Sequence, residues 1–394
     1  MTTLPPLSLY VHLPWCVRKC PYCDFNSHAL KASLPEREYI DALLRDLDFD
    51  LPRVAGRRIE TVFFGGGTPS LFSAEAIDRL LTETRRRIPF AADAEITLEA
   101  NPGTVEHGRF AEYKAAGINR LSIGVQSFDP QQLQKLGRIH SADEATRAAE
   151  EAHAAGLDNF NLDLMYGLPG QTPAQAVQDL QQAIALTPAH LSHYQLTLEP
   201  NTLFHAHPPP LPDEEASWEM QQQCHALLAD HAYAQYEISA YARHQQRCRH
   251  NLNYWRFGDY LGIGAGAHGK LTDTSGTRWR LWKVKHPASY LRDAGTRAGL
   301  GGVNAVAPGE IGFEFMLNRL RLMDSFTEAE FTAASGQDFG RVRPAAERAT
   351  RLGLMEGTGG EWLVTRRGHT YLNELQQLFL PNATDLPAGS GNRA

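Results

Sequence analysis

Apolar residues along the first half of the chain follow two alternating patterns. Short apolar runs, typical of buried strands, alternate with longer segments in which apolar residues recur at helical spacing. The predicted strands with their loops lie at residues 8–14, 59–70, 94–102, 120–128, 159–170 and 190–202, and the predicted helices at residues 36–50, 74–87, 105–118, 143–157 and 173–186. Five or six consecutive β-loop-α units predict a parallel sheet with its helices outside. Right-handed crossovers would curl this sheet into a full or partial barrel.

The second half of the chain departs from this alternation. Residues 205–217 are rich in proline, a helix is expected at residues 218–230, and strand and loop character then returns as far as residue 271. We expect irregular structure at residues 273–310, where glycine and threonine are frequent. From Ile311 the spacing predicts several helices and then a strand, a turn and a last helix, which is typical of a small winged-helix domain.

These changes divide the chain into three predicted parts. We expect a barrel with its extension at residues 1–300, a C-terminal helical domain of winged-helix type at residues 301–384, and a disordered tail at residues 385–394. The length of 394 residues suits one large α/β barrel with an appendage, and 42% apolar residues are enough for a full core.

The ends of the predicted strands carry unusual residues. In barrels of parallel strands the chemistry takes place at the carboxyl ends of the strands. Here those ends read CVRKCPYC, GGGTPS, EANPGT, GVQSFD and DLMYGLPG. The sequence therefore places its candidate functional residues where a barrel would have its site.

Three of the five cysteines lie within eight residues, as Cys16-x-x-x-Cys20-x-x-Cys23. This clustering favours metal ligation over disulfide pairing. Thiolates are the preferred ligands of iron–sulfur clusters, and three of them leave one iron of a [4Fe-4S] cube open to another ligand. The alternatives are chance clustering and a zinc site, which His12 or His28 would have to complete.

Charge and hydropathy exclude two classes of protein. The net charge of −7 argues against a general nucleic-acid binder, which needs a basic face. No apolar run is long enough to span a bilayer, and the N-terminus lacks the basic region of a signal peptide. We therefore expect a cytoplasmic protein with reduced thiols and no stable membrane anchor.

The cysteine spacing, directly after a first strand, resembles the radical S-adenosylmethionine superfamily. The resemblance implies a [4Fe-4S] cluster on Cys16, Cys20 and Cys23, with S-adenosylmethionine on the fourth iron and its cleavage to a 5′-deoxyadenosyl radical. Tyr22 resembles the aromatic residue that packs near the adenine. The run Gly65–Pro69 resembles the motif that contacts the methionine amino group, where glycine lets the backbone approach a ligand.

A closer resemblance extends over residues 8–380. The segments YVHLPWCVRKCPYCDF, FFGGGTPS, GVQSF, NLDLMYGLPGQT and HNLNYWRFGDYLGIGAGAH resemble the oxygen-independent coproporphyrinogen III oxidase family. This resemblance implies an α/β fold, a partial (β/α)6 barrel of the TIM type, followed by a C-terminal helical domain.

The resemblance also assigns individual residues. Tyr10, Gly66 and Glu99 match contacts of the cluster-bound S-adenosylmethionine, and contacts of a second S-adenosylmethionine are matched by Gly67, Thr68, Gln126, Arg138 and Asp163. Carboxylates can accept hydrogen bonds from ribose hydroxyls or an amine, and arginine can pair with a carboxylate. As an alternative, Glu99 and Asp163 would form structural salt bridges at the barrel mouth.

Two departures from the oxidases point to one subfamily. The oxidases carry a fourth cysteine where this chain has Phe25, and they carry an N-terminal extension that this sequence lacks. Both departures, with the motif HNxxYW at residues 250–255, resemble the haem chaperone subfamily. That resemblance implies binding of haem and its delivery to haem proteins of the respiratory chain.

His250 is the predicted haem ligand, because imidazole is the commonest axial ligand of haem iron. Tyr254 and Trp255 offer aromatic surface for the macrocycle, and Arg247 or Arg249 could pair with its propionates. Alternatively, this motif forms loop hydrogen bonds and fills core. His268 and Cys248 are alternative candidates for the haem ligand, and we also expect His268 near S-adenosylmethionine. Cys224 is expected to be buried in a helix.

Three functions remain open at this level. The first is a haem chaperone whose cluster supports dimerisation or haem transfer. For this chaperone, both a cluster-dependent homodimer and a monomer remain open. The second is an oxidative decarboxylase of porphyrinogen propionates, in which the cofactor carries the radical chemistry. The third is a radical enzyme acting on haem or another tetrapyrrole.

Overall fold

The computed structural model describes residues 4–54, 56–104 and 108–381. The predicted disordered tail at residues 385–394 lies outside the described residues. None of the helices in these ranges is both long enough and apolar enough to cross a membrane.

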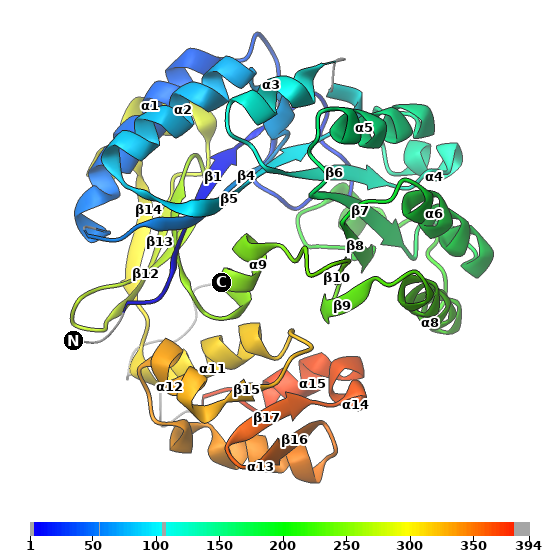
Figure 1. Cartoon of the computed structure of the whole chain (residues 1–394), viewed down its shortest axis with the longest axis vertical. Helices are drawn as coiled ribbons and strands as arrows, with labels where there is room; N and C mark the ends of the chain where they lie inside the picture. The colour runs from blue at the N-terminus through cyan, green and yellow to red at the C-terminus, as the bar shows by residue number, and fades with distance from the viewer. Residues whose placement is uncertain (1–3, 55, 105–107, 382–394) are drawn as a thin grey trace.

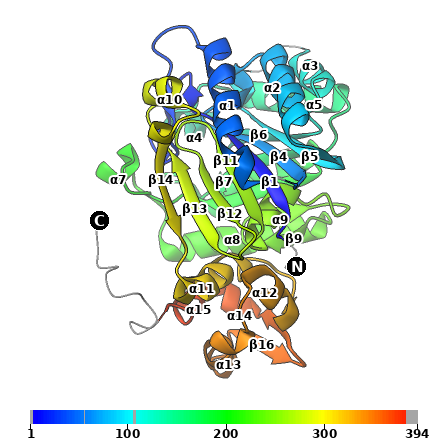
Figure 2. The same cartoon turned by 90° about the vertical axis from the view of Figure 1, so that its left-hand side faces the viewer.

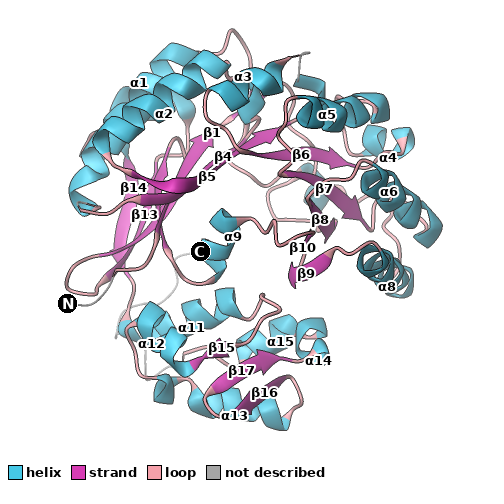
Figure 3. Cartoon of the chain, viewed as in Figure 1, coloured by secondary structure: helices cyan, strands magenta, loops and turns pink. Residues whose placement is uncertain are grey.

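A sheet of twelve strands dominates the fold, and its middle is the predicted parallel barrel. Six neighbouring strands run parallel, in the order β1 (Leu7–Leu13), β4 (Ile59–Gly66), β5 (Phe90–Ala100), β6 (Arg120–Gln126), β7 (Phe160–Tyr166) and β8 (His190–Gln195). The sheet curves, and its helices lie on the convex side (Figures 1 and 3). The partial (β/α)6 barrel predicted from the sequence is therefore confirmed.

The outer helices include α1 (Glu36–Asp50), α2 (Ala74–Arg87), α3 (Arg109–Ala115), α5 (Ala142–Ala154), α6 (Pro173–Ala185) and α8 (Glu214–Asp230). Local side chains satisfy free backbone N–H groups at the start of α2, α5, α6 and α8. Ser141 caps α5 and Thr172 caps α6, each with a reciprocal bond from the residue three positions on. Asp213 caps α8, so this helix begins four residues earlier than its apolar spacing predicted.

Antiparallel strands extend the sheet at both edges. On one side β11 (Asp259–Ile263) lies parallel to β1 and is followed by β12 (His268–Thr272), β13 (Arg278–Lys283) and β14 (Leu300–Ala305); on the other side lie β10 (Ala240–Ala242) and β9 (Ala234–Glu237). The prediction of irregular structure at residues 273–310 was wrong, because β13, β14 and α10 (Pro287–Asp293) lie there. Charged side chains hid β13: Lys283 is buried and pairs with Asp46 and Asp50 on α1, far away in sequence.

The C-terminal part packs around its own aromatic core beneath the ends of β12–β14 (Figure 2). Its elements are α11 (Pro308–Arg319), β15 (Phe326–Thr327), α12 (Glu328–Ser335), α13 (Arg343–Arg351), β16 (Met355–Thr358), β17 (Glu361–Val364), α14 (Arg366–Thr370) and α15 (Leu372–Gln377). Three short strands, in the order β15-β17-β16, join the predicted helices. The predicted domain boundary between residues 300 and 301 falls at the start of β14.

The short helix α9 (Arg249–Trp255) lies between the large sheet and the C-terminal part (Figure 1). The Glu95 carboxylate on β5 accepts the backbone N–H groups of Arg249 (3.1 Å) and His250 (3.0 Å), which gives the first turn of α9 its missing partners. Asn253 donates to Ser8 Oγ on β1 (2.8 Å). Polar side chains inside the barrel thus hold α9, and with it the HNxxYW motif, against β1, β4 and β5.

Candidate functional site

The three clustered cysteines lie at the carboxyl end of the first barrel strand. Cys16 ends the short strand β2 (Trp15–Cys16), which pairs with β3 (His28–Ala29), and Cys20 and Cys23 lie in the loop that these two strands close. All three are free thiols and line one cavity of about 370 Å³. The structure therefore brings together the three predicted cluster ligands.

A cluster would bind these cysteines as thiolates, so the protonation of the thiols bears on its assembly. Burial raises the pKa of Cys16 and of Cys23, while Arg138 Nη1 donates to Cys20 Sγ at 3.6 Å. Metal binding would therefore displace protons from these thiols. Within the described ranges no three His, Cys, Asp or Glu side chains converge as ligands of a single ion do. A [4Fe-4S] cluster does not require such convergence, because each cysteine binds a different iron.

Most of the other predicted cofactor contacts line the same cavity. They are Tyr22, Gly66, Gly67, Thr68, Glu99, Gln126, Arg138 and Asp163. Sequence reasoning missed further residues of this lining, among them Asn101, Ser122, Ser192, Tyr194, Glu237 and Arg321. Ser122 and Ser192 are single polar residues within apolar strands, a pattern that does not mark a binding site. Arg321 belongs to the C-terminal part, and no local sequence pattern indicates that this part reaches the cavity.

The glycine run fits tightly between β1 and the cysteine strand. A Cβ on Gly66, whose φ is 117°, would lie 2.6 Å from the His12 ring, and a Cβ on Gly67 would lie 2.5 Å from the carbonyl oxygen of Trp15. The N–H of Thr68 donates to the same Trp15 oxygen at 2.7 Å. These glycines thus fix the cysteine strand against β4, a structural role beside the predicted contact with a ligand.

Two carboxyl groups line the cavity and have uncharged hydrogen-bond partners, although the buried Arg120 lies near enough to Asp163 to oppose the rise in its pKa. Burial, and then the nearby Asp163, raises the pKa of Glu99 to about 8, and burial also raises the pKa of Asp163. Glu99 accepts from the Gly66 N–H at 3.2 Å, and Asp163 accepts from Asn161 (2.8 Å) and Ser122 (3.0 Å). In the described part of the chain these hydrogen-bond partners are uncharged, so the alternative of structural salt bridges finds no support here.

Gln126 and Arg138 complete the opposite wall. Gln126 ends β6 with a left-handed φ of 71°, a strained conformation that the surrounding structure must hold in place. Its Oε1 accepts from the Tyr194 hydroxyl at 2.8 Å. Arg138 Nη2 donates to the Gly124 carbonyl at 2.6 Å, while its buried Nε has no partner among the described residues. A donor of this kind suits a carboxylate in the cavity.

A second cavity, of about 720 Å³, adjoins the cysteine cavity and contains the HNxxYW motif. The two cavities share a wall formed by Phe25, Ser27, Gly66, Asn251 and Trp255. We call the second one the aromatic cavity. Its rings and imidazoles come from Tyr10, His12, His28, Phe63, His250, Tyr254, Tyr260 and His268, and its cations from Lys19 and Lys285. Tyr10 and His268, both predicted near S-adenosylmethionine, therefore lie here and not in the cysteine cavity lining.

The hydrogen bonds of His250 define its tautomer. The Thr61 hydroxyl donates to Ser8 Oγ (2.7 Å), so it must accept the 2.9 Å hydrogen bond from His250 Nδ1–H. Nε2 then carries the lone pair, and it has no hydrogen-bond partner among the described residues. Burial, and then Arg120, lowers the pKa of His250 to about 3, so the imidazole is neutral at pH 7. A neutral imidazole with a free Nε2 is a metal ligand.

The other residues that the sequence suggested as haem ligand or propionate contacts do not line the aromatic cavity, with the exception of His268. Arg249 pairs with Asp93 and Arg247 stacks on Tyr236, and neither lines the aromatic cavity. Cys248 is also outside the lining; it is buried, which raises the pKa of its thiol to about 12. Cys224 is buried in α8, as predicted.

The glycines before His268 pack closely against neighbouring segments. A Cβ on Gly264 would lie 2.3 Å from the His12 carbonyl oxygen, and a Cβ on Gly266 would lie 2.4 Å from Asn26 Nδ2. The glycines are therefore explained by tight packing of β11 and its following turn against the cysteine loop. The expectation that these glycines mark a close ligand stays a prediction, and Gly266 also lines the aromatic cavity.

Comparison with known proteins agrees with this geometry. Residues 10–183 match the family model of the radical SAM superfamily, and residues 306–370 match the HemN C-terminal domain. The heme chaperone HemW of Escherichia coli is 52% identical over 380 residues, covering 96% of this chain and 100% of that protein. The heme chaperone HemW of Haemophilus influenzae is 51% identical, covering 96% and 99%.

A solved structure and a mammalian relative extend the comparison. The structure of coproporphyrinogen III oxidase HemN from Escherichia coli has a TM-score of 0.81 at 24% identity, covering 95% of this chain and 90% of that chain, which shows the shared fold. The mitochondrial radical S-adenosyl methionine domain-containing protein 1 of Mus musculus is 40% identical over 294 residues, covering 73% of this chain and 66% of that protein. With the cysteine loop, the glycine run and the two adjoining cavities, these likenesses lead to one conclusion: the chain belongs to the heme chaperone HemW family of the radical SAM superfamily.

Proposed function

We propose that this protein is a cytoplasmic chaperone that binds haem in the aromatic cavity and delivers it to haem proteins of the respiratory chain. The observation that carries this proposal is His250, whose Nε2 has no hydrogen-bond partner among the described residues and which lines a 720 Å³ cavity rich in aromatic side chains. Membership of the HemW family supports it. A cavity of this size and character suits a flat, largely apolar ligand with a few polar groups.

His250 is well placed to hold haem iron. Its Nδ1–H donates to Thr61, and a second-shell hydrogen bond of this kind orients an imidazole and raises its basicity as a ligand. The Glu95 carboxylate holds the first turn of α9, so the ring is carried by a rigid element. Phe63 packs against the ring with centroids 5.1 Å apart, which limits its rotation.

The remaining lining suits the macrocycle and its propionates. Tyr254 and Trp255 meet edge to face with centroids 4.9 Å apart, and both rings line the cavity. Phe25, 60% exposed, adds an apolar face at the wall shared with the cysteine cavity. Lys19 and Lys285 are the cations in this lining, and we assign the propionate contacts to them.

The cysteine cavity would hold a [4Fe-4S] cluster on Cys16, Cys20 and Cys23, together with S-adenosylmethionine. When bound, the cluster supplies one-electron chemistry to that cofactor. Glu99 and Asp163 accept hydrogen bonds from hydroxyl or ammonium groups of a ligand, and the free Nε of Arg138 can donate to its carboxylate.

One observation favours a second function, oxidative decarboxylation of porphyrinogen propionates. Gln126, Arg138 and Asp163 face the same cavity as the cysteines, as the resemblance to the oxidases predicts. Product analysis of the reduced protein separates the two functions. Copious 5′-deoxyadenosine that depends on added porphyrinogen would favour the enzyme, and slow formation without that dependence would favour the chaperone.

The test of the chaperone is an anaerobic haem titration of the cluster-reconstituted full chain, followed by the Soret band. We expect saturation near one haem per chain, and at least a tenfold weaker affinity with an altered Soret band for His250→Ala. His207→Ala is the matched control, because His207 is exposed and lies outside both cavities. Saturable binding that is unchanged in His250→Ala would move the ligand to another residue, and no saturable binding would overturn the proposal.

A further inference from the structure

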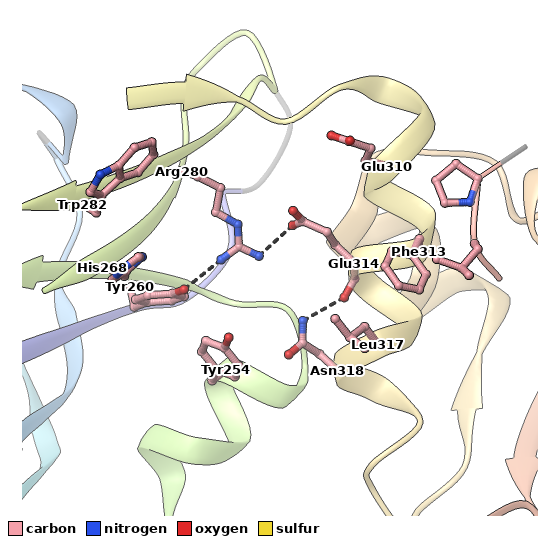
Figure 4. A pocket seen from close by; sticks show the side chains of 12 residues that line it. Tyr254, Tyr260, His268, Arg280, Trp282, Glu310, Phe313, Glu314, Leu317 and Asn318 are labelled. Carbon is pink, nitrogen blue, oxygen red and sulfur yellow. Dashed lines mark hydrogen bonds and ion pairs between the residues drawn. The ribbon is translucent and has the colours of Figure 1, made fainter. Parts of the chain in front are cut away.

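A third cavity, of about 860 Å³, opens between β12, β13 and helix α11 of the C-terminal part (Figure 4). The functions proposed so far do not use it. Its walls combine aromatic and apolar side chains with three charged ones, and its lining includes Trp282, Phe313, Leu317, Arg280, Glu310 and Glu314. We call it the outer cavity.

An ion pair ties the two sides of the outer cavity together. Arg280 on β13 donates to the Tyr260 hydroxyl at 2.8 Å and pairs with Glu314 on α11 at 2.7 Å. In Figure 4 these three side chains form a line that runs from β11 to α11. The two sides of the outer cavity are therefore linked by a direct ion pair, and Arg280 places a cation in its lining.

Three side chains line both the outer cavity and the aromatic cavity, namely Tyr254, Tyr260 and His268. The two cavities therefore meet at these residues. Tyr254 belongs to the motif that carries His250, and His268 is the first residue of β12. Aromatic surface thus lies between the site at His250 and the outer cavity.

His268 differs from its imidazole neighbours in what its nitrogens do. His12 accepts from the Tyr10 hydroxyl (3.0 Å) and donates to the Asn26 carbonyl (2.9 Å), so both of its nitrogens are used. His268 is exposed, and neither ring nitrogen has a hydrogen-bond partner within the described ranges. Its ring stacks on Trp282, with centroids 6.3 Å apart and planes at 21°.

We propose that His268 is a second, outer binding station for the haem iron, from which haem leaves the protein. This inference rests on the proposed function, and it assigns the transfer step to the outer cavity. The bond between iron and His250 Nε2 breaks, and a bond between iron and a His268 ring nitrogen forms. Each imidazole donates a lone pair, so the iron keeps its oxidation state and no proton is transferred.

The chemistry of His268 suits this exchange. Partial burial, with Lys285 and Arg280 nearby, lowers its pKa, which keeps a lone pair available at pH 7. It lacks the hydrogen bond to a buried hydroxyl that orients His250, so it should hold iron less tightly. A weaker outer ligand would divide the slow dissociation of haem from His250 into two faster steps. Differences in affinity between related complexes usually lie in such dissociation rates.

The test measures haem transfer from the loaded full chain to apomyoglobin by stopped-flow absorbance. His268→Gln removes the ligand but keeps a polar side chain, and His268→Met keeps an atom that binds iron. We expect transfer from His268→Gln to slow at least tenfold, and by a larger factor than any fall in its haem affinity. His268→Met should regain most of the rate, and the control His207→Ala should behave as wild type.

The outcomes separate this inference from the proposed function. Transfer from His268→Gln that is as fast as from His207→Ala would overturn the outer station and leave the chaperone standing. Loss of equilibrium binding in His268→Gln, with binding intact in His250→Ala, would make His268 the resting ligand and overturn the two-step order. If the wild-type chain shows no saturable binding, both proposals fail.

Discussion

The cysteine cavity and the aromatic cavity lie side by side, yet they are built from different parts of the fold. The cysteine cavity is lined largely by the carboxyl ends of the barrel strands, with Glu99, Gln126 and Asp163 from three successive strands. The aromatic cavity depends on α9 and on the strands β11 and β12, which extend the barrel. The residues that match the radical SAM model thus lie in the barrel, while the proposed haem site also depends on elements added to it.

The first way to break this comparison is to remove the cluster ligands. Changing Cys16, Cys20 and Cys23 together to serine should abolish the [4Fe-4S] cluster, measured by iron content and visible absorbance, because serine does not replace a thiolate ligand here. Haem affinity should stay within threefold, since none of these cysteines lines the aromatic cavity. The control changes Cys224 to serine and should retain the cluster. Loss of haem binding in the triple variant would show that the cavities are not separate.

A second change sharpens the role of His250. Thr61→Val removes the hydroxyl that accepts from His250 Nδ1–H, and haem affinity should fall roughly tenfold in a Soret titration. Thr97→Val is the matched control, because Thr97 is a buried threonine on the next strand whose hydroxyl has no partner among the described residues. Equal affinities of the two variants would argue that this hydrogen bond does not support the ligand.

The third prediction concerns pH and the cysteine cavity. The pKa of Glu99 is raised to about 8 in the fold, above its ordinary value near 4.5, so between these values the folded chain binds more protons than the unfolded one. Stability from this group is present at low pH and is lost as pH rises toward 8. Glu99→Gln should therefore gain stability relative to wild type from pH 5 to 8, by roughly 2–4 kcal/mol, because water in the cavity reduces the full shift.

Chemical denaturation of the metal-free chain at several pH values measures this gain. Glu112→Gln, at an exposed position on α3, serves as the control and should show no such trend. A pH-independent difference between Glu99→Gln and wild type would mean that Glu99 is ionised in the folded protein throughout this range.

The smallest effect is expected where the C-terminal part reaches the shared wall. Arg321 pairs with the buried Glu237 at 3.2 Å, and its guanidinium lies 4.4 Å from the centre of the Trp255 ring. Arg321→Ala should lower the free energy of unfolding by about 1–2 kcal/mol and alter the tryptophan fluorescence. Arg292→Ala removes an exposed pair and should change stability by less than about 0.5 kcal/mol.

Local patterns were enough to predict the barrel and its cysteine loop. The apolar runs of the six parallel strands are buried, and Cys16, Cys20 and Cys23 lie within eight residues, so both signals are short in sequence. The prediction failed where distant residues supply the missing partner. Lys283 is buried in a strand only because Asp46 and Asp50 neutralise it from the other end of the domain.

The same limit applies to the site. The sequence identified the HNxxYW motif but gave no means to tell that Glu95 would hold its helix or that Thr61 would fix the His250 tautomer. Arg321 was missed because it belongs to a different part of the chain. Contacts of this kind follow from the packing of distant segments, which a single sequence does not display.

The wall of five residues that the cavities share has a thermodynamic consequence. Trp255 and Asn251 face both spaces, so a ligand that shifts either side chain in one cavity changes the free energy of binding in the other. Such coupling is reciprocal: if S-adenosylmethionine changes the affinity for haem by some factor, haem changes the affinity for S-adenosylmethionine by the same factor. If haem binds in the aromatic cavity as proposed, coupling through this wall would stay within the threefold change expected on loss of the cluster ligands, and it would need no catalytic turnover.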